Sequence, residues 1–158
     1  MILHPISPVF DKDSRVLILG SFPSVRSREE GFFYGHPQNR FWKVTAQVFG
    51  ENTPLTVDEK KAFLLRNHIA LWDVICSCDI EGSSDSSIRN VKANDISVIL
   101  DTADIQEIFL NGQKAYKYYQ KYIFPSVKRE GICLPSTSPA NAAWSLGKLS
   151  EAWRIIHN

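Results

Sequence analysis

The chain has 158 residues, of which 44% are apolar, and these values are typical of a globular domain with one hydrophobic core. The apolar content excludes a largely disordered chain. The formal net charge of +1 argues against a protein that wraps nucleic acid through many phosphate contacts, but it is compatible with an enzyme that touches a few phosphates around one nucleotide. We therefore expect a single domain over residues 1–158.

The cysteines favour a reducing compartment and give no sign of a metal site. Cys76, Cys78 and Cys133 are an odd number without a regular framework, which indicates reduced thiols in a cytoplasmic protein. The C-x-C spacing of the first two is too short for common zinc sites, so we expect buried, inert thiols and no metal or other cofactor. We also expect no signal peptide, no membrane association and a monomeric protein.

Short apolar runs alternate with amphipathic segments along the chain. This alternation predicts an α/β fold with three α/β/α layers around a central four-stranded parallel sheet. In chain order we expect a strand over 15–19, helices over 40–49 and 56–67, a strand over 68–75, a helix over 93–102, a strand over 106–110, a helix over 112–122, a strand over 131–134 and a helix over 141–156.

Several helix ends carry recognisable capping signals. Asn39 or Gln38 is expected to cap the helix that Gly50 ends, and Thr56 to Glu59 reads as a capping box. Asn94 is a plausible cap for the helix over 93–102. A helix that starts at Asn141 would offer free backbone N–H groups to a phosphate.

Two polar loops follow predicted strands, and parallel strands would bring both loops to one edge of the sheet, where such folds bind ligands. The first contains GSFPS (residues 20–24) and then YGHPQNRFW (residues 34–42). The second is LPSTSPAN (residues 134–141), which is stiff and rich in hydroxyl groups. Each loop alone has an ordinary explanation as a turn or a capped helix start, and Asn39 alone is more simply a helix cap.

Together the two loops resemble those of the uracil-DNA glycosylase superfamily. In mismatch-specific uracil glycosylases the first loop reads GINPG, followed by an aromatic residue and HPxNRFW. This chain has Phe22 at the position of the water-positioning Asn, and Leu134 where the relatives have a polar residue. The whole pattern is most similar to the hypoxanthine-DNA (DNA-deoxyinosine) glycosylase branch, in which the Asn of HPxN, here Asn39, is catalytic.

This resemblance implies a uracil-DNA glycosylase-like fold and a monofunctional enzyme of base-excision repair that acts on DNA containing a deaminated base, with hypoxanthine preferred. The base would be flipped into a pocket and its N-glycosidic bond hydrolysed without a metal or a covalent nucleophile. Asn39 would hold the water or the base edge, and Tyr34 would stack on the base unless it is a core tyrosine. The remaining substrate-binding candidates are Gly20, Ser21, Phe22, Pro23, His36 and Asp73.

Contacts to DNA are expected from the second loop. The resemblance assigns the phosphates beside the lesion to Ser136, Thr137 and Ser138, and the gap left by the flipped base to Pro139, Ala140 and Asn141. Asp73 or Asp85 would accept the N1–H of hypoxanthine or orient water, although a cap or a solvated charge is the commoner role. Arg40, Lys43 and Lys148 are further candidate DNA contacts, with surface charge as the alternative.

Two other functions stay open at this point. The chain could be a mismatch-specific uracil- or thymine-type glycosylase that uses Asn39, and competition between uracil and hypoxanthine substrates would separate the two enzymes. It could also be a catalytically silent DNA-binding module, an alternative that Phe22 keeps open. An unrelated α/β protein with convergent loops is the third possibility.

Overall fold

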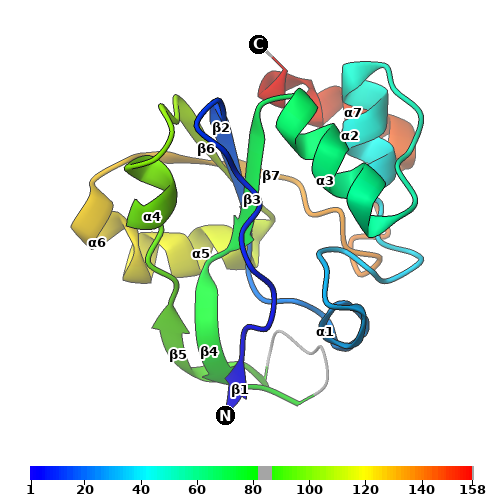
Figure 1. Cartoon of the computed structure of the whole chain (residues 1–158). Helices are drawn as coiled ribbons and strands as arrows, with labels where there is room; N and C mark the ends of the chain where they lie inside the picture. Colours follow the sequence, from blue (N-terminus) through cyan, green and yellow to red (C-terminus); the bar gives the residue numbers. More distant parts are fainter. Residues whose placement is uncertain (82–86, 158) are drawn as a thin grey trace.

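A computed structural model describes residues 1–81 and 87–157. Its centre is a parallel four-stranded sheet with the strand order β3-β2-β6-β7 (Figure 1). The registers are parallel at every pairing, so the predicted sheet and fold class are confirmed. Its strands are β2 (Val16–Gly20), β3 (Ile69–Asp73), β6 (Glu107–Asn111) and β7 (Gly131–Leu134).

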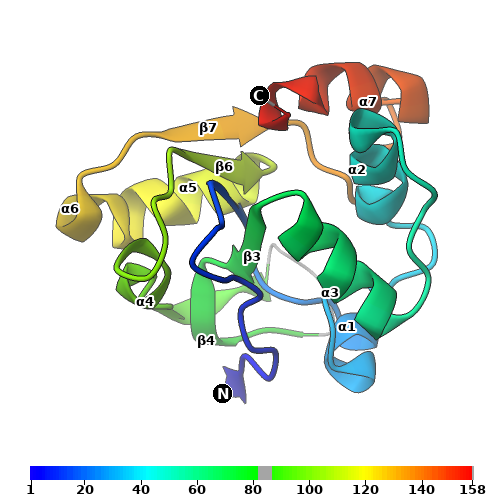
Figure 2. The ribbon, with the colours of Figure 1, turned by 45° about the horizontal axis from the view of Figure 1, so that its top comes forward.

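Helices cover both faces of this sheet, which gives the three layers (Figures 1 and 2). One face carries α2 (Phe41–Phe49), α3 (Val57–Arg66) and α7 (Leu146–Trp153), and the 3-10 turn Arg154–Ile156 follows α7. The opposite face carries α4 (Ser97–Leu100), α5 (Gln113–Tyr122) and α6 (Phe124–Val127). Within the described ranges, none of the helices has the length and apolar character that crossing a membrane requires.

The central strand β2 divides its side chains between two cores. Ile18 packs with the helices α2, α3 and α7, whereas Leu17 and Leu19 pack with α4 and α5 on the other face. All three side chains are fully buried, and each burial stabilises the fold by roughly 1.5–3 kcal/mol. A strand that is buried on both faces has a continuous apolar sequence, and this pattern is why the strand could be predicted.

Local capping signals set the helices before β3 as predicted. Gly50 ends α2 with a φ of 66°, a left-handed conformation that glycine adopts without strain. The side chain of Thr56 accepts the N–H of Glu59, and the Glu59 carboxylate accepts the N–H of Thr56 in return. Both the position and the mechanism of this capping box are confirmed.

The apolar run over 68–75 is not one strand, as its sequence suggested. The chain leaves the parallel sheet after β3 and continues as β4 (Ile75–Asp79), which pairs with β1 (Ile2–Leu3) and β5 (Arg89–Ala93) in a second, antiparallel sheet. Asn94 does not cap a helix here, because its amide donates to the carbonyls of Asp73 and Ile75 at 2.8 and 3.2 Å. The predicted helix over 93–102 is therefore reduced to α4.

The last helix starts five residues later than predicted, at Leu146 rather than Asn141. Ser145 caps it by accepting the N–H of Lys148, and Asn141 instead turns its amide toward the carbonyl of Ser136. The expected helix N-terminus at Asn141 was therefore wrong. The segment between β7 and α7 is a loop held by its own side chains. A separate short helix, α1 (Val25–Glu30), lies within the first loop, between its residues 20–24 and 34–42.

The carboxyl ends of all four parallel strands meet at one edge of the sheet. The chain passes from β2 outward to β3 and then returns to β6 on the other side of β2, so the strand order reverses between β2 and β6. Ligands of open α/β sheets bind at such a reversal, outside the carboxyl ends of the strands. The loops that follow β2 and β7 both leave the sheet here, as predicted.

Candidate active site

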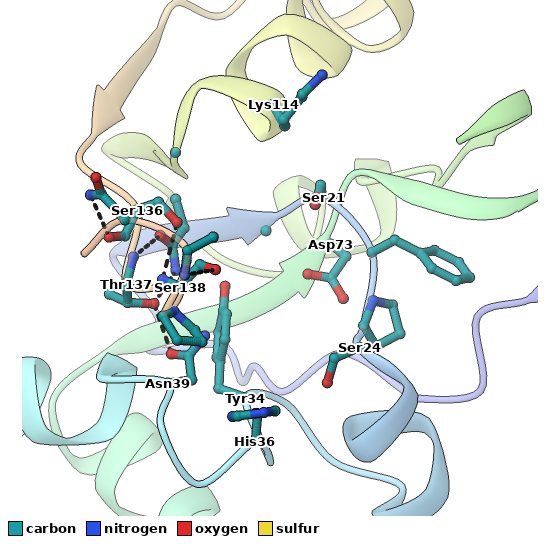
Figure 3. Close-up of a pocket in the computed structure, with 18 of the residues that line it drawn as sticks. Ser21, Ser24, Tyr34, His36, Asn39, Asp73, Lys114, Ser136, Thr137 and Ser138 are labelled. Carbon is teal, nitrogen blue, oxygen red and sulfur yellow. Dashed lines mark hydrogen bonds between the residues drawn. The ribbon is translucent and has the colours of Figure 1, made fainter. Parts of the chain in front are cut away.

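One pocket of about 850 Å³ lies at this edge (Figure 3). The final residue of each parallel strand lines it: Gly20, Asp73, Asn111 and Leu134. The structure also brings most of the predicted site residues together in this pocket, while the role of each remains a prediction; Arg40, Lys43 and Lys148 do not line it. The predicted residues that line it are Gly20, Ser21, Phe22, Pro23, Tyr34, His36, Asn39, Asp73, Ser136, Thr137, Ser138, Pro139, Ala140 and Asn141.

The side chain of Asn39 uses its oxygen for structure. Oδ1 accepts the backbone N–H of Phe41 at 2.9 Å and the hydroxyl of Thr137 at 2.9 Å. The N-cap residue of α2 is Arg40, but it is the Asn39 side chain that satisfies a free N–H at this helix start. Among the described residues nothing accepts a hydrogen bond from Nδ2, so the amide offers a donor to the pocket.

Thr137 joins Asn39 to the end of strand β6. Its hydroxyl accepts from Nδ2 of Asn111 at 3.0 Å, and its backbone N–H donates to Oδ1 of Asn111 at 3.1 Å. Thr137 is fully buried and its one hydroxyl proton is committed to Asn39. The three residues therefore form a continuous hydrogen-bond chain in the pocket lining. The bond from Thr137 to Asn39 is drawn as a dashed line in Figure 3.

Arg40 fastens the second loop to the first. Its guanidinium donates to the carbonyl oxygens of Ser138, Asn141 and Trp144, the first two at 3.3 and 3.1 Å. The backbone N–H of Arg40 also donates to the carbonyl of Thr137 at 3.1 Å. The planar fork of arginine suits several acceptors at once. Arg40 is thus engaged with protein carbonyls, which neither of the two sequence interpretations, DNA contact or surface charge, had anticipated.

Tyr34 stands between the two halves of the pocket. Its ring stacks on Phe41 with centroids 4.3 Å apart, so one face is covered by the core, and its backbone has a φ of 53°. The hydroxyl oxygen is buried and makes no hydrogen bond of normal geometry with a described residue, although the Asn111 side chain lies close enough to favour the ionised phenol. Burial, and to a lesser extent the negative charge of Asp73, raises the pKa of the Tyr34 phenol well above its usual range. Tyr34 therefore presents a neutral hydroxyl with an unused hydrogen bond.

Gly20 leaves room for the groups around it. A Cβ atom at this position would collide with Oδ1 of Asp73 and would lie 2.7 Å from the Tyr34 hydroxyl. Only the absence of a side chain lets these two polar groups approach the end of β2 together. The glycine that follows the first strand is thus required by close packing.

Asp73 is the last residue of β3 and is almost fully buried, and His4 lies behind its carboxylate. Its Oδ2 accepts a 2.8 Å hydrogen bond from Nε2 of His4, a residue 69 positions earlier. His4 also packs edge-on against Phe22, with ring centroids 5.9 Å apart. Asp85, the rival carboxylate in the sequence, lies outside the described residues. Among the described residues, Asp73 is the carboxylate that lines the pocket.

Ser136 and Ser138 in the second loop accept backbone hydrogen bonds through their hydroxyl oxygens, and their hydroxyl protons remain available. Oγ of Ser136 accepts the N–H of Ser138, and Oγ of Ser138 accepts the N–H of Ala140, each at 3.1 Å. No described residue accepts from either hydroxyl, so both can still donate. His36 is exposed and supports its own turn, because Nδ1 accepts the N–H of Gln38 at 3.1 Å.

Sequence reasoning missed several residues of the pocket region, among them two polar side chains of the lining and one residue behind it. Asn111 and Lys114 line the pocket, and His4 lies behind Asp73. The Asn111-Gly112 pair directly follows a predicted strand, so its place at the same sheet edge was a usable signal. The role of His4 has no local signal, because it depends on a contact made far along the chain.

Comparisons with known proteins agree with this architecture. A family model described as the uracil DNA glycosylase superfamily matches residues 7–157. A protein named hypoxanthine DNA glycosylase from Methanosarcina acetivorans is 36% identical over 158 residues, covering 99% of this chain and 98% of the relative. Its namesake from Methanosarcina barkeri is 33% identical over 148 residues, with 92% of both chains covered.

A solved structure also matches over the whole length. It is a solution NMR structure, described as a candidate uracil DNA glycosylase from Methanosarcina acetivorans, with a TM-score of 0.82, 32% identity and 100% coverage of both chains. The sheet order, the pocket at its carboxyl edge and the family match over nearly the entire sequence lead to one assignment. This chain belongs to the uracil DNA glycosylase superfamily.

Proposed function

We propose that the protein is a monofunctional DNA glycosylase of base-excision repair that removes a deaminated base, with hypoxanthine preferred. The observation that carries the proposal is the Asn39–Thr137 hydrogen bond, which joins the two signature loops over one pocket. Two relatives named hypoxanthine DNA glycosylase, matched over 99% and 92% of this chain, support the choice of base.

In this proposal the damaged nucleotide is flipped out of the duplex into the pocket. Flipping costs a few kcal/mol and is cheaper for a mispaired base such as hypoxanthine. The bond from C1′ to the base nitrogen breaks, and its electron pair leaves with the base. A water oxygen then bonds to C1′, and the proton that this water loses neutralises the departed base anion. The residues need to supply position and charge stabilisation rather than a covalent bond.

Asn39 and Asp73 would hold the flipped base from different sides. The Nδ2 group of Asn39 is the unused donor of its amide, so it would donate to an acceptor on the base edge and stabilise the negative charge that develops on the departing base. Asp73 would accept the N1–H of hypoxanthine through the oxygen that His4 does not occupy. Gly20, Ser21, Phe22 and Pro23 would form the wall beside the base.

The second loop would bind the strand beside the lesion. Ser136 and Ser138 keep free hydroxyl protons for phosphate oxygens, whereas Thr137 is fully buried and serves to join the loops. Pro139, Ala140 and Asn141 line the rim of the same loop and would fill the gap left by the flipped base. A small set of phosphate contacts fits the nearly neutral chain.

The test is release of free base from labelled duplexes that carry deoxyinosine, deoxyuridine or no lesion, singly and in competition. We expect hypoxanthine release that exceeds uracil release, and none from the undamaged duplex. Preferential uracil release would move the protein to the mismatch-specific uracil enzymes. Binding of lesion DNA with no release of either base would contradict catalysis and leave a silent binding module.

A further inference from the structure

We propose that His4 is a positioning residue: it fixes the Asp73 carboxylate as an acceptor for a base that carries a ring N–H, so that the pair selects deaminated bases over their amino-bearing parents. This inference rests on the proposed function and adds to it a residue and a basis for selectivity. It starts from the contacts of His4, which lies outside both signature loops.

The hydrogen bonds of His4 assign its tautomer. Nδ1 accepts the backbone N–H of Ile6 at 3.2 Å, so this nitrogen carries a lone pair. Nε2 must then hold the ring proton, and it donates that proton to Oδ2 of Asp73 at 2.8 Å. The imidazole is therefore a neutral donor with a fixed direction.

The surroundings keep both side chains in place. The side chains of His4 and Asp73 are 2% and 5% exposed, and His4 packs edge-on against Phe22 and Trp72. The backbone N–H of His4 donates to the carbonyl of Cys76 at 2.8 Å, which ties the N-terminal segment to β4. The N-terminal segment thus holds the histidine in place, and among the described residues Asp73 is the acceptor of its Nε2 proton.

The second oxygen of Asp73 is left for a ligand. Oδ2 is occupied by His4, and Oδ1 accepts no hydrogen bond from the described residues although Asp73 is only 3% exposed. Oδ1 lies at the end of β2, where a Cβ on Gly20 would collide with it. In Figure 3, Asp73 lies on one side of Tyr34, and Asn39, Thr137 and Ser138 lie on the other. Asp73 lines the pocket, and a carboxylate oxygen without a protein donor on a pocket wall is a ready acceptor for an N–H group of a ligand.

Deamination of a base changes the ring nitrogen that would face Oδ1 of Asp73, from a lone pair to an N–H group. Hypoxanthine has an N–H at ring position 1 and uracil has one at ring position 3. Adenine and cytosine carry a lone pair on the corresponding nitrogen, which a carboxylate oxygen repels. A carboxylate held in one orientation therefore accepts from the deaminated base and disfavours its parent. Without the donor from His4, the carboxylate would be free to rotate, and the discrimination would weaken.

The test compares two purines that differ at this edge. Single-turnover base release is measured from duplexes with deoxyinosine and with deoxynebularine, a purine nucleoside that lacks both O6 and the N1–H. The proteins are the wild type, His4→Phe, His4→Gln, Asp73→Ala and the His4→Phe/Asp73→Ala double variant. His157→Phe, at an exposed histidine that contacts Phe49, is the matched control.

We expect His4→Phe and Asp73→Ala each to lower the ratio of the deoxyinosine rate to the deoxynebularine rate by roughly ten- to hundredfold, the range for a hydrogen bond to a charged group. His4→Gln should retain most of the ratio, because its amide can replace the Nε2 donor. The double variant should match Asp73→Ala. Activity on deoxynebularine reports that each variant is folded.

Two results would overturn the inference while leaving the glycosylase intact. One is a His4→Phe variant that slows both substrates equally, which would make His4 a structural tie. The other is a double variant in which the two losses multiply, since His4 would then not act through Asp73. A folded wild type that releases no hypoxanthine would instead overturn the proposed function, and with it this inference.

Discussion

The hydroxyl of Thr137 donates a 2.9 Å hydrogen bond to Oδ1 of Asn39 across 98 positions of sequence. This contact decides which atom of the Asn39 amide faces the pocket. Because Oδ1 also accepts from the N–H of Phe41, the amide cannot flip without losing two hydrogen bonds. The second loop thus orients a residue of the first.

Removing that hydroxyl should impair both stability and base release. Thr137→Val keeps the volume but leaves Nδ2 of Asn111 without its acceptor and frees the Asn39 side chain. We expect the free energy of unfolding to fall by about 1–3 kcal/mol and base release to fall by roughly tenfold or more. Denaturant unfolding and single-turnover release measure the two. Thr102→Val, at an exposed threonine, is the control and should change neither. A wild-type rate for Thr137→Val would exclude this orienting role.

Arg40 should affect DNA binding through the shape of the loop and not through a phosphate. Arg40→Gln removes a guanidinium that bonds carbonyls of the second loop. We expect weaker binding of lesion DNA with an unchanged dependence of log Kd on log salt. Loss of a phosphate contact would instead reduce that slope by about one. Arg154→Gln, at an exposed arginine on the last helical turn, is the control.

Adding a methyl group at Gly20 should lower the free energy of unfolding, whereas the same addition at Gly147 in α7 should raise it. Gly20→Ala places a Cβ against Oδ1 of Asp73 and the Tyr34 hydroxyl, so we expect a loss of about 1–3 kcal/mol in unfolding free energy and a blocked pocket. Gly147→Ala meets no atom within 4 Å and lies in the first turn of α7, where alanine gains up to about 0.5 kcal/mol. Thermal unfolding of both variants checks the opposite signs.

Tyr34 gives a prediction at alkaline pH. Its pKa is raised in the folded protein, whereas an unfolded phenol ionises near pH ~10. Above that pH the unfolded state loses a proton that the folded state retains, so stability falls as pH rises. Tyr34→Phe should remove this part of the loss and be at least as stable as the wild type near pH 8, because the lost hydroxyl is unpartnered. Urea midpoints at pH 8 and pH 11 would show it.

An equal loss of stability in Tyr34→Phe and the wild type between these two pH values would contradict that account. The comparison is internally controlled, because Tyr119, whose pKa burial raises to about 12, is present in both proteins and contributes equally. Any difference between the two urea series therefore belongs to Tyr34.

The sequence predicted those parts of the fold that depend on local chemistry. The strands β2, β3 and β6 are largely buried apolar runs, and α3 starts at a capping box, so short segments specify both. The turn after β3 was missed because the apolar run continues through it, and the Asn94 amide that holds it lies 21 positions beyond Asp73. Neither the hydrophobic periodicity nor a helix-capping pattern of the sequence indicates such a long-range hydrogen bond.

The candidate site shows the same division. Tyr34, Asn39 and the second loop were found from motifs, and all of them line the pocket. The His4–Asp73 and Arg40–Asn141 hydrogen bonds join residues 69 and 101 positions apart, so no motif contains them. The motifs do not reveal the long-range hydrogen bonds that fix each side chain. These bonds decide which atoms of the side chain remain available to a ligand.

The most direct test of the account is hypoxanthine release by Asn39 variants on one deoxyinosine duplex, measured together with unfolding. Asn39→Asp keeps an oxygen for Phe41 and Thr137 but loses the Nδ2 donor, whereas Asn39→Ala loses both. We predict that each variant releases hypoxanthine at least about 100-fold more slowly, and that only Asn39→Ala loses about 1 kcal/mol of stability. Release by Asn39→Asp at the wild-type rate would contradict the central claim that the Asn39 amide donor carries catalysis.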